Sequence, residues 1–121
     1  MEKEAGKFCV VLVTAPKADV ASKIARGLVK RKLAACVSEL PGITSHFFWE
    51  GELQKDAEVL LIAKTRSSLV PDIVGFVREN HPAEVPEVIS LPIMDGFKEY
   101  LEWVGANTLL TKPEEEIRFP L

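Results

Sequence analysis

Two long β-forming segments that meet at Glu50-Gly51 constrain the fold of this chain more than any other feature. The first segment runs from Leu33 to Trp49 with an interruption at Pro41-Gly42, and the second runs from Leu53 to Thr65. Glu-Gly is a candidate two-residue turn, so the pattern predicts a long β-hairpin whose first strand bends or bulges at Pro41-Gly42. Arms longer than about 10 residues exceed what one small domain buries, which indicates self-association.

The rest of the sequence predicts a strand and a helix before the hairpin, and a helix, a strand and a third helix after it. Short β-branched runs indicate the strands, and apolar residues at every third or fourth position indicate the helices. The expected elements are a strand at Phe8–Thr14, a helix capped by Asp19 and ending near Lys32, a helix from Ser67 or Ser68 to Asn80-His81, a strand at Val88–Met94 placed at an edge by Pro92, and a helix capped by Asp95.

This order of elements predicts an α+β fold. Two right-handed β-α-β crossovers that share the central hairpin generate a ferredoxin-like β-α-β-β-α-β sandwich, with a four-stranded antiparallel sheet and two helices on one face. The C-terminal helix is additional and covers part of the other face. Because the remainder of that face is apolar, we expect a homo-oligomer.

Size, charge and composition narrow the class of protein. The chain has 121 residues, a mass of 13.4 kDa and a formal charge of -3. We expect one domain at residues 8–110 between partly disordered tails at residues 1–7 and 111–121. The charge disfavours nucleic acid as a partner, and the absence of both a bilayer-spanning apolar run and a signal-peptide stretch predicts a cytoplasmic protein.

Neither the cysteines nor the catalytic motifs indicate an enzyme. Cys9 and Cys36 are too few for a disulfide scaffold, lie on strands that the topology separates by another strand, and are typical of buried small hydrophobes. The two histidines, His46 and His81, stand outside any Gly-x-Ser-x-Gly context, and the glycines form no phosphate loop. We therefore expect a non-catalytic protein.

The segment from His81 to Glu87 is the strongest candidate binding site. It places the His81 imidazole and the carboxylates of Glu84 and Glu87 in a loop stiffened by Pro82 and Pro86. Imidazole and carboxylate together suit Cu(II), Zn(II) and similar ions. The alternative is a helix C-terminus leading into a strand, in which the imidazole only favours the helix dipole.

Two further groups of residues have a structural and a functional interpretation. The aromatic cluster Phe47, Phe48 and Trp49 at the hairpin tip is either a ligand platform or a contact with a neighbouring subunit, and hairpin tips of this type favour the contact. The basic residues of the first helix form a solvated face, and they are Lys23, Arg26, Lys30, Arg31 and Lys32.

Several spaced motifs together resemble the CutA divalent-cation tolerance family. Such motifs in the right order are more specific than any one of them. The resemblance covers roughly Phe8 to Asn107 and rests on Thr14-Ala15-Pro16, Leu33-Ala34-Ala35-Cys36-Val37, Pro41-Gly42-Ile43-Thr44-Ser45, Trp49-Glu50-Gly51, Leu61-Ile62-Ala63-Lys64-Thr65, His81-Pro82, Val85-Pro86-Glu87-Val88-Ile89, Pro92-Ile93 and Tyr100-Leu101-Glu102-Trp103.

The resemblance implies a tight homotrimer of ferredoxin-like subunits whose long hairpins interlock. It also implies a role in tolerance of copper and other divalent metals, as in bacterial members, whereas animal members are linked to acetylcholinesterase at the neuronal membrane. For this chain we expect a divalent metal ion, copper in particular, as the ligand. The predicted subunit interface contains Phe47, Phe48, Trp49, Tyr100 and Trp103.

The family's site residues carry over in part. His81 matches a histidine implicated in copper binding, and Glu84 and Glu87 complete the predicted metal-binding set. A cysteine that some members place before Thr-Ala-Pro is Val13 here, and a second histidine is Asn80. A tyrosine common after His-Pro is Ala83. These departures favour a site assembled between subunits.

Two other functions fit the same fold. Trimeric small-molecule sensors of the nitrogen-regulatory signalling family resemble CutA in assembly and bind nucleotide in subunit clefts. A scaffold trimer would instead bind an unidentified protein partner on its outer surface or through the acidic tail at Glu114–Glu116. An acylphosphatase-like site and an RNA-binding surface are excluded, because Ala15-Pro16-Lys17-Ala18 replaces the phosphate loop and the first strand carries only Phe8 as an aromatic.

Overall fold

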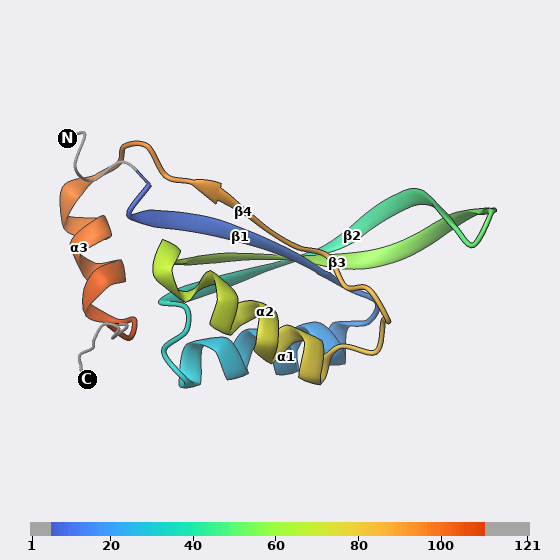
Figure 1. Cartoon of the computed structure of the whole chain (residues 1–121), viewed down its shortest axis with the longest axis horizontal. Helices are drawn as coiled ribbons and strands as arrows, with labels where there is room; N and C mark the ends of the chain where they lie inside the picture. The colour runs from blue at the N-terminus through green and yellow to red at the C-terminus, as the bar shows by residue number, and fades with distance from the viewer. Residues whose placement is uncertain (1–5, 111–121) are drawn as a thin grey trace.

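A computed structural model of the chain, described here for residues 6–110, contains a four-stranded antiparallel sheet and three α-helices (Figure 1). The strands lie in the order β2-β3-β1-β4. This is the predicted α+β ferredoxin-like arrangement with an additional C-terminal helix. Along the chain the elements are β1 (Phe8–Ala15), α1 (Ala18–Lys30), β2 (Cys36–Trp49), β3 (Glu52–Arg66), a 3-10 turn η2 (Ser67–Leu69), α2 (Val70–Asn80), β4 (Val88–Pro92) and α3 (Lys98–Ala106).

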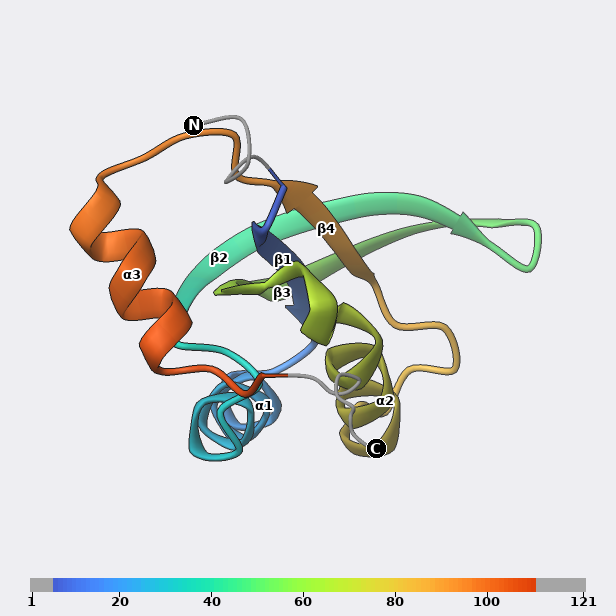
Figure 2. The same ribbon diagram turned by 60° about the vertical axis from the view of Figure 1, so that its left-hand side comes forward.

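Helices α1 and α2 pack side by side against one face of the sheet (Figure 2). The alternation of side chains along a strand sends every second residue toward them. On β1 these are Cys9, Val11, Val13 and Ala15, all at most 2% exposed. They meet the buried apolar faces of the two helices, which include Ile24, Leu28, Ile73, Phe76 and Val77.

The predicted hairpin is confirmed, and its far end extends beyond the helix-covered body (Figure 1). The β2-β3 register shifts between Leu40 and Ile43, and Gly42 there has a φ of 83°. At the tip Glu50 and Gly51 have φ of 52° and 80°. Two consecutive positive values define the hairpin turn that follows the twist of the strands. Glycine accepts this conformation freely, whereas Glu50 adopts it at a cost.

The two predicted helix caps are wrong. Helix α1 has Lys17 at its N-cap, and helix α3 begins at Lys98 after Phe97. The Asp19 and Asp95 carboxylates each accept a hydrogen bond from the next backbone N–H, both at 2.8 Å, instead of from an amide two or three residues on. The other boundaries differ by three residues at most: β2 begins at Cys36 rather than Leu33, α2 at Val70 after the turn η2, and α1 and β4 end at Lys30 and Pro92.

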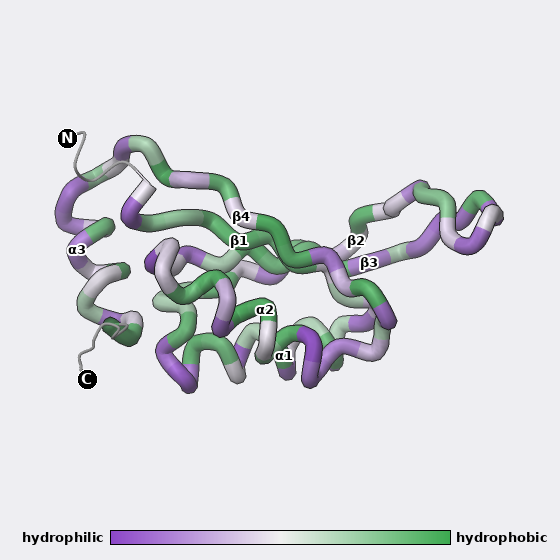
Figure 3. Tube along the Cα trace, in the orientation of Figure 1, coloured by the Kyte–Doolittle hydropathy of each residue, from purple (hydrophilic) through white to green (hydrophobic). Residues whose placement is uncertain are grey.

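The second face of the sheet is covered at one end only. Helix α3 buries Phe8, Ala35 and Val104 there, as expected for the last helix. Elsewhere on this face Leu40, Ile89 and Leu91 are 50%, 51% and 52% exposed. The hydropathy-coloured trace shows β1 and β4 as largely apolar (Figure 3). An extended apolar surface therefore remains open in the single chain.

Several smaller predictions are also tested by the structure. Cys9 is buried, but Cys36 is partly exposed, with its sulfur 3.8 Å from Lys64 Nζ. The five basic residues predicted to form a solvated face are all exposed. Most of the predicted tails lies outside the described residues, and Lys7 is hydrogen-bonded through its carbonyl to the Ser67 N–H at 2.9 Å. No helix in residues 6–110 has the length and apolar character required to cross a bilayer.

Candidate functional site

His81 lies directly after α2, where the chain leaves the helix and turns toward β4. Its Nδ1 accepts a hydrogen bond from the Ala83 N–H at 3.0 Å, and its Nε2 lies 2.7 Å from the Thr14 carbonyl oxygen. Because Nδ1 acts as an acceptor, Nε2 carries the proton and donates to Thr14. The imidazole thus joins the start of the loop to the end of β1.

This hydrogen bonding determines what His81 can do as a ligand. A metal ion binds a histidine nitrogen through its lone pair. Nδ1 has its lone pair directed at the Ala83 N–H, and Nε2 is protonated. Metal binding at His81 therefore replaces one of these two hydrogen bonds, and the surviving one then orients the ring.

The loop forms one wall of a groove of about 830 Å³, and the β2-β3 hairpin forms the other. His81, Glu84 and Glu87 all line it. From the hairpin come a second imidazole, two further carboxylates and two aromatic rings. The lining residues that the hairpin contributes are Ser45, His46, Phe47, Trp49, Asp56 and Glu58.

The groove is rich in carboxylates, but its donors are spread out. Glu84 and Glu87 are exposed, and Glu58 accepts a hydrogen bond from the Ser45 hydroxyl at 2.6 Å. Within residues 6–110 no group of three or more His, Cys, Asp or Glu side chains is arranged to hold one ion. The set of His81, Glu84 and Glu87 thus shares a groove without forming a chelate in the single chain.

Of the hairpin residues in this groove, the sequence pattern singled out Phe47 and Trp49 as a ligand platform or subunit contact, but it did not indicate Asp56 or Glu58. The hairpin register pairs Asp56 with Ser45 and Glu58 with Ile43. That pairing places Asp56 and Glu58 on one face of β3, because alternate residues share a face. The register alone does not show that this face lies opposite the loop after α2. That proximity depends on how the hairpin is oriented relative to the rest of the domain.

The predicted interface residues occupy two separate places. Phe47, Phe48 and Trp49 are 38%, 73% and 40% exposed near the hairpin tip. Tyr100 and Trp103 stack on α3 with ring centroids 5.6 Å apart and are 41% and 45% exposed. Partial burial and the neighbouring Cys36 thiol raise the pKa of the Tyr100 hydroxyl. Both aromatic groups therefore leave apolar surface exposed in the single chain.

Known proteins resemble this chain over most of its length. The family described as "CutA1 divalent ion tolerance protein" matches residues 9–107. "Protein CutA homolog" of Xenopus laevis is 56% identical over 100 residues, which are 83% of this chain and 66% of that protein. The chain therefore spans about two thirds of that relative. The "Divalent-cation tolerance protein CutA" of Thermus thermophilus is 46% identical over 99 residues, which are 82% of this chain and 96% of that protein.

A solved structure extends the likeness to three dimensions. The crystal structure of CutA1 from Oryza sativa superposes with a TM-score of 0.85 at 44% sequence identity. The alignment covers 89% of this chain and 99% of the rice chain.

Proposed function

Because this chain belongs to the CutA1 divalent ion tolerance protein family, we propose that it is a non-catalytic homotrimer that acts in the response to metal ions. In this role it binds divalent metal ions, copper in particular. The groove between the loop after α2 and the hairpin is the proposed site. His81 is its principal ligand, with Glu84 and Glu87 as further donors.

The observation that carries this proposal is the chemistry of the groove. It combines the His81 imidazole with four carboxylates, those of Asp56, Glu58, Glu84 and Glu87. Imidazole favours Cu(II) and Zn(II) among the divalent ions, and carboxylates add charge neutralisation. Phe47 and Trp49 in the wall lower the local polarity, which strengthens electrostatic attraction.

The trimer is proposed because the single chain leaves apolar surface without a cover. Leu40, Ile89 and Leu91 are about half exposed on one sheet face, and the hairpin extends past the body with its aromatic residues. Three interlocked hairpins would bury both. Since the donors of one groove do not form a chelate, a group from a neighbouring chain would complete the ligand set.

We also propose a cytoplasmic location for the protein. Cys9 and Cys36 are both unpaired thiols, and they lie on strands separated by β3. Thiols of this kind persist in reducing compartments.

Two measurements on chelator-stripped protein test the proposal. They are a calorimetric titration with Cu(II) and a molecular mass from light scattering. We expect at most one tight site per chain in a particle three times the mass of one chain. His81→Ala should weaken binding at least about tenfold, which corresponds to about 1.4 kcal/mol. Because this variant also removes the bonds to Thr14 and Ala83, the doubly substituted Glu84→Gln/Glu87→Gln protein provides an independent test.

The matched control is Glu79→Gln, since Glu79 is an exposed carboxylate on α2 that does not line the groove. It should leave the Cu(II) affinity within twofold of the starting protein. An unchanged affinity in both groove variants would reject the metal site. A mass of one chain at micromolar concentration would reject the trimer.

A further inference from the structure

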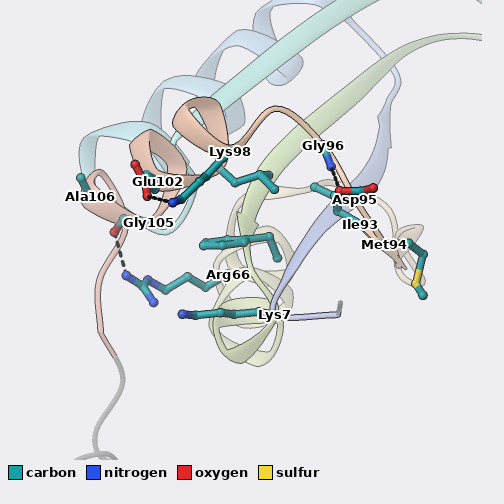
Figure 4. A pocket seen from close by; sticks show the side chains of 12 residues that line it. Lys7, Arg66, Ile93, Met94, Asp95, Gly96, Lys98, Glu102, Gly105 and Ala106 are labelled. Carbon is teal, nitrogen blue, oxygen red and sulfur yellow. Dashed lines mark hydrogen bonds and ion pairs between the residues drawn. The ribbon is translucent and has the colours of Figure 1, made fainter. Parts of the chain in front are cut away.

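A second cavity, of about 760 Å³, lies beneath α3 at the opposite end of β1 from the metal groove (Figure 4). Its wall is formed by Lys7 and Phe8 at the start of β1, Arg66 at the end of β3, the segment 93–98 and the inner side of α3. Nothing in the proposed metal function uses these residues.

The floor of this cavity is apolar. Phe8 is only 5% exposed, so the accessible apolar surface comes from Ile93 and Leu101, which are partly buried against the cluster of Phe8, Ala35 and Val104. Met94 closes one side with a flexible thioether that is 66% exposed. Such a floor favours a flat apolar body, and methionine adapts its shape to one.

The charges around the floor leave one positive charge in excess. Lys7, Arg66 and Lys98 face two carboxylates, Asp95 and Glu102. Lys98 and Glu102 pair with each other at 4.0 Å, which is the only ion pair within residues 6–110. The positive charges of Lys7 and Arg66 thus face only one further negative charge, that of Asp95.

The two remaining cations converge on one aromatic ring. Lys7 Nζ lies 5.8 Å and the Arg66 guanidinium carbon 5.9 Å from the centroid of Phe8. Figure 4 shows both side chains extended in the same direction across the cavity. The like charges repel each other, and an anion bound between them would remove this cost.

Arg66 is held in place by uncharged partners. Its Nη2 donates to the Gly105 carbonyl at 2.8 Å, and its Nε donates to the Thr108 hydroxyl at 3.0 Å. Burial lowers the pKa of this guanidinium, as expected for a desolvated cation. The group is therefore oriented in advance, which reduces the entropy lost when a ligand binds.

We propose that the cavity beneath α3 binds a small organic monoanion with a flat apolar body, of the aromatic carboxylate class. The carboxylate lies between Lys7 and Arg66, and the body lies on Ile93 and Leu101 above the buried Phe8 ring. A polyanion is disfavoured because Asp95 would repel it. A neutral aromatic leaves both cations without a counter-charge.

The two methionines of the chain allow a direct test with 2-naphthoate as the probe. In metal-free protein labelled with ¹³C at the methionine methyl groups, only two resonances occur, from Met1 and Met94. We expect saturable displacement of the Met94 resonance by 2-naphthoate. The uncharged isostere 2-naphthamide should bind at least about fivefold more weakly.

Lys7→Glu reverses one of the two cations, and it should raise the dissociation constant for 2-naphthoate about fivefold. Lys7 is exposed, so the variant should fold normally. The matched control is Lys23→Glu on α1, which changes the net charge equally at an exposed position outside the cavity. The absence of saturable displacement, equal binding of the amide, or equal effects of the two substitutions would each overturn the proposal.

Discussion

The two faces of the sheet are built from the same strands but differ in burial. On the face toward α1 and α2, Val11 and Leu61 are completely buried. On the other face, Ile89 and Leu91 pair with β1 at Leu12 and Val10 and are about half exposed. Both faces are apolar, so hydrophobicity alone does not decide burial. The position of the two crossover helices decides it.

A single chain therefore completes only one large hydrophobic core. The helix-covered face has its own hydrophobic cluster from β1, β3, α1 and α2. The second face has a small cluster around Phe8 beneath α3 and is otherwise open. Stability of the first face is therefore a property of the chain, and stability of the second is proposed to be a property of the assembly.

Placing a charge on the open face should have the largest effect. Leu91→Glu puts a carboxylate where the trimer would bury a leucine, at a cost of several kcal/mol per chain. We expect the light-scattering mass to fall to that of one chain, 13.4 kDa, while the far-UV circular dichroism stays the same. Ser68→Glu, at an exposed site in η2, is the control and should leave the mass unchanged. Retention of the trimer by Leu91→Glu would show that this face is not an interface.

Removing side-chain volume from the closed face should be the next largest effect. Leu61→Ala should reduce the free energy of unfolding by about 3 kcal/mol, because the leucine is fully buried and leaves a cavity. Urea denaturation measures this loss, which should not depend on protein concentration below the range where the proposed trimer would assemble. Leu91→Ala should reduce the free energy of unfolding by a smaller amount at low protein concentration and by a larger amount at high protein concentration. Equal losses at every concentration would contradict the distinction between the faces.

The smallest expected effect is the pH dependence of the two faces. Burial raises the pKa of the Cys9 thiol from its ordinary 9.0, so the unfolded chain loses this proton at lower pH than the folded chain. Stability is then fully present below pH 9.0 and declines as the pH rises toward the folded-state pKa, by at most about 1.4 kcal/mol per pH unit. Urea denaturation at a series of alkaline pH values should show a flatter decline in Cys9→Ala.

Tyr100 is the matching group on α3. Its pKa is also raised above the ordinary 10.0, but the side chain is 41% exposed, so solvent screens much of the effect. Tyr100→Phe should therefore flatten the alkaline decline less than Cys9→Ala does. A larger effect of Tyr100→Phe would indicate that α3 is more deeply buried in the assembly than in the single chain.

The candidate site was predictable only in part, and the residues show why. His81, Glu84 and Glu87 follow one another along the chain, so a local pattern of ligand types was enough to select them. Asp56 and Glu58 lie on the hairpin, more than twenty residues earlier, and their place in the groove depends on the crossing of hairpin and loop. The hydrogen bond from His81 to Thr14 spans 67 residues and was equally out of reach.

The sequence by itself determined the order of elements and the long hairpin with its bulge at Pro41-Gly42 and turn at Glu50-Gly51. These follow from local rules of periodicity, backbone conformation and turn chemistry. Only the tertiary structure decided the true N-caps of α1 and α3, the engagement of both His81 nitrogens and the cavity where Lys7 and Arg66 meet at Phe8. The physical reason is that these features depend on contacts between segments distant in sequence, which packing fixes and local pattern does not.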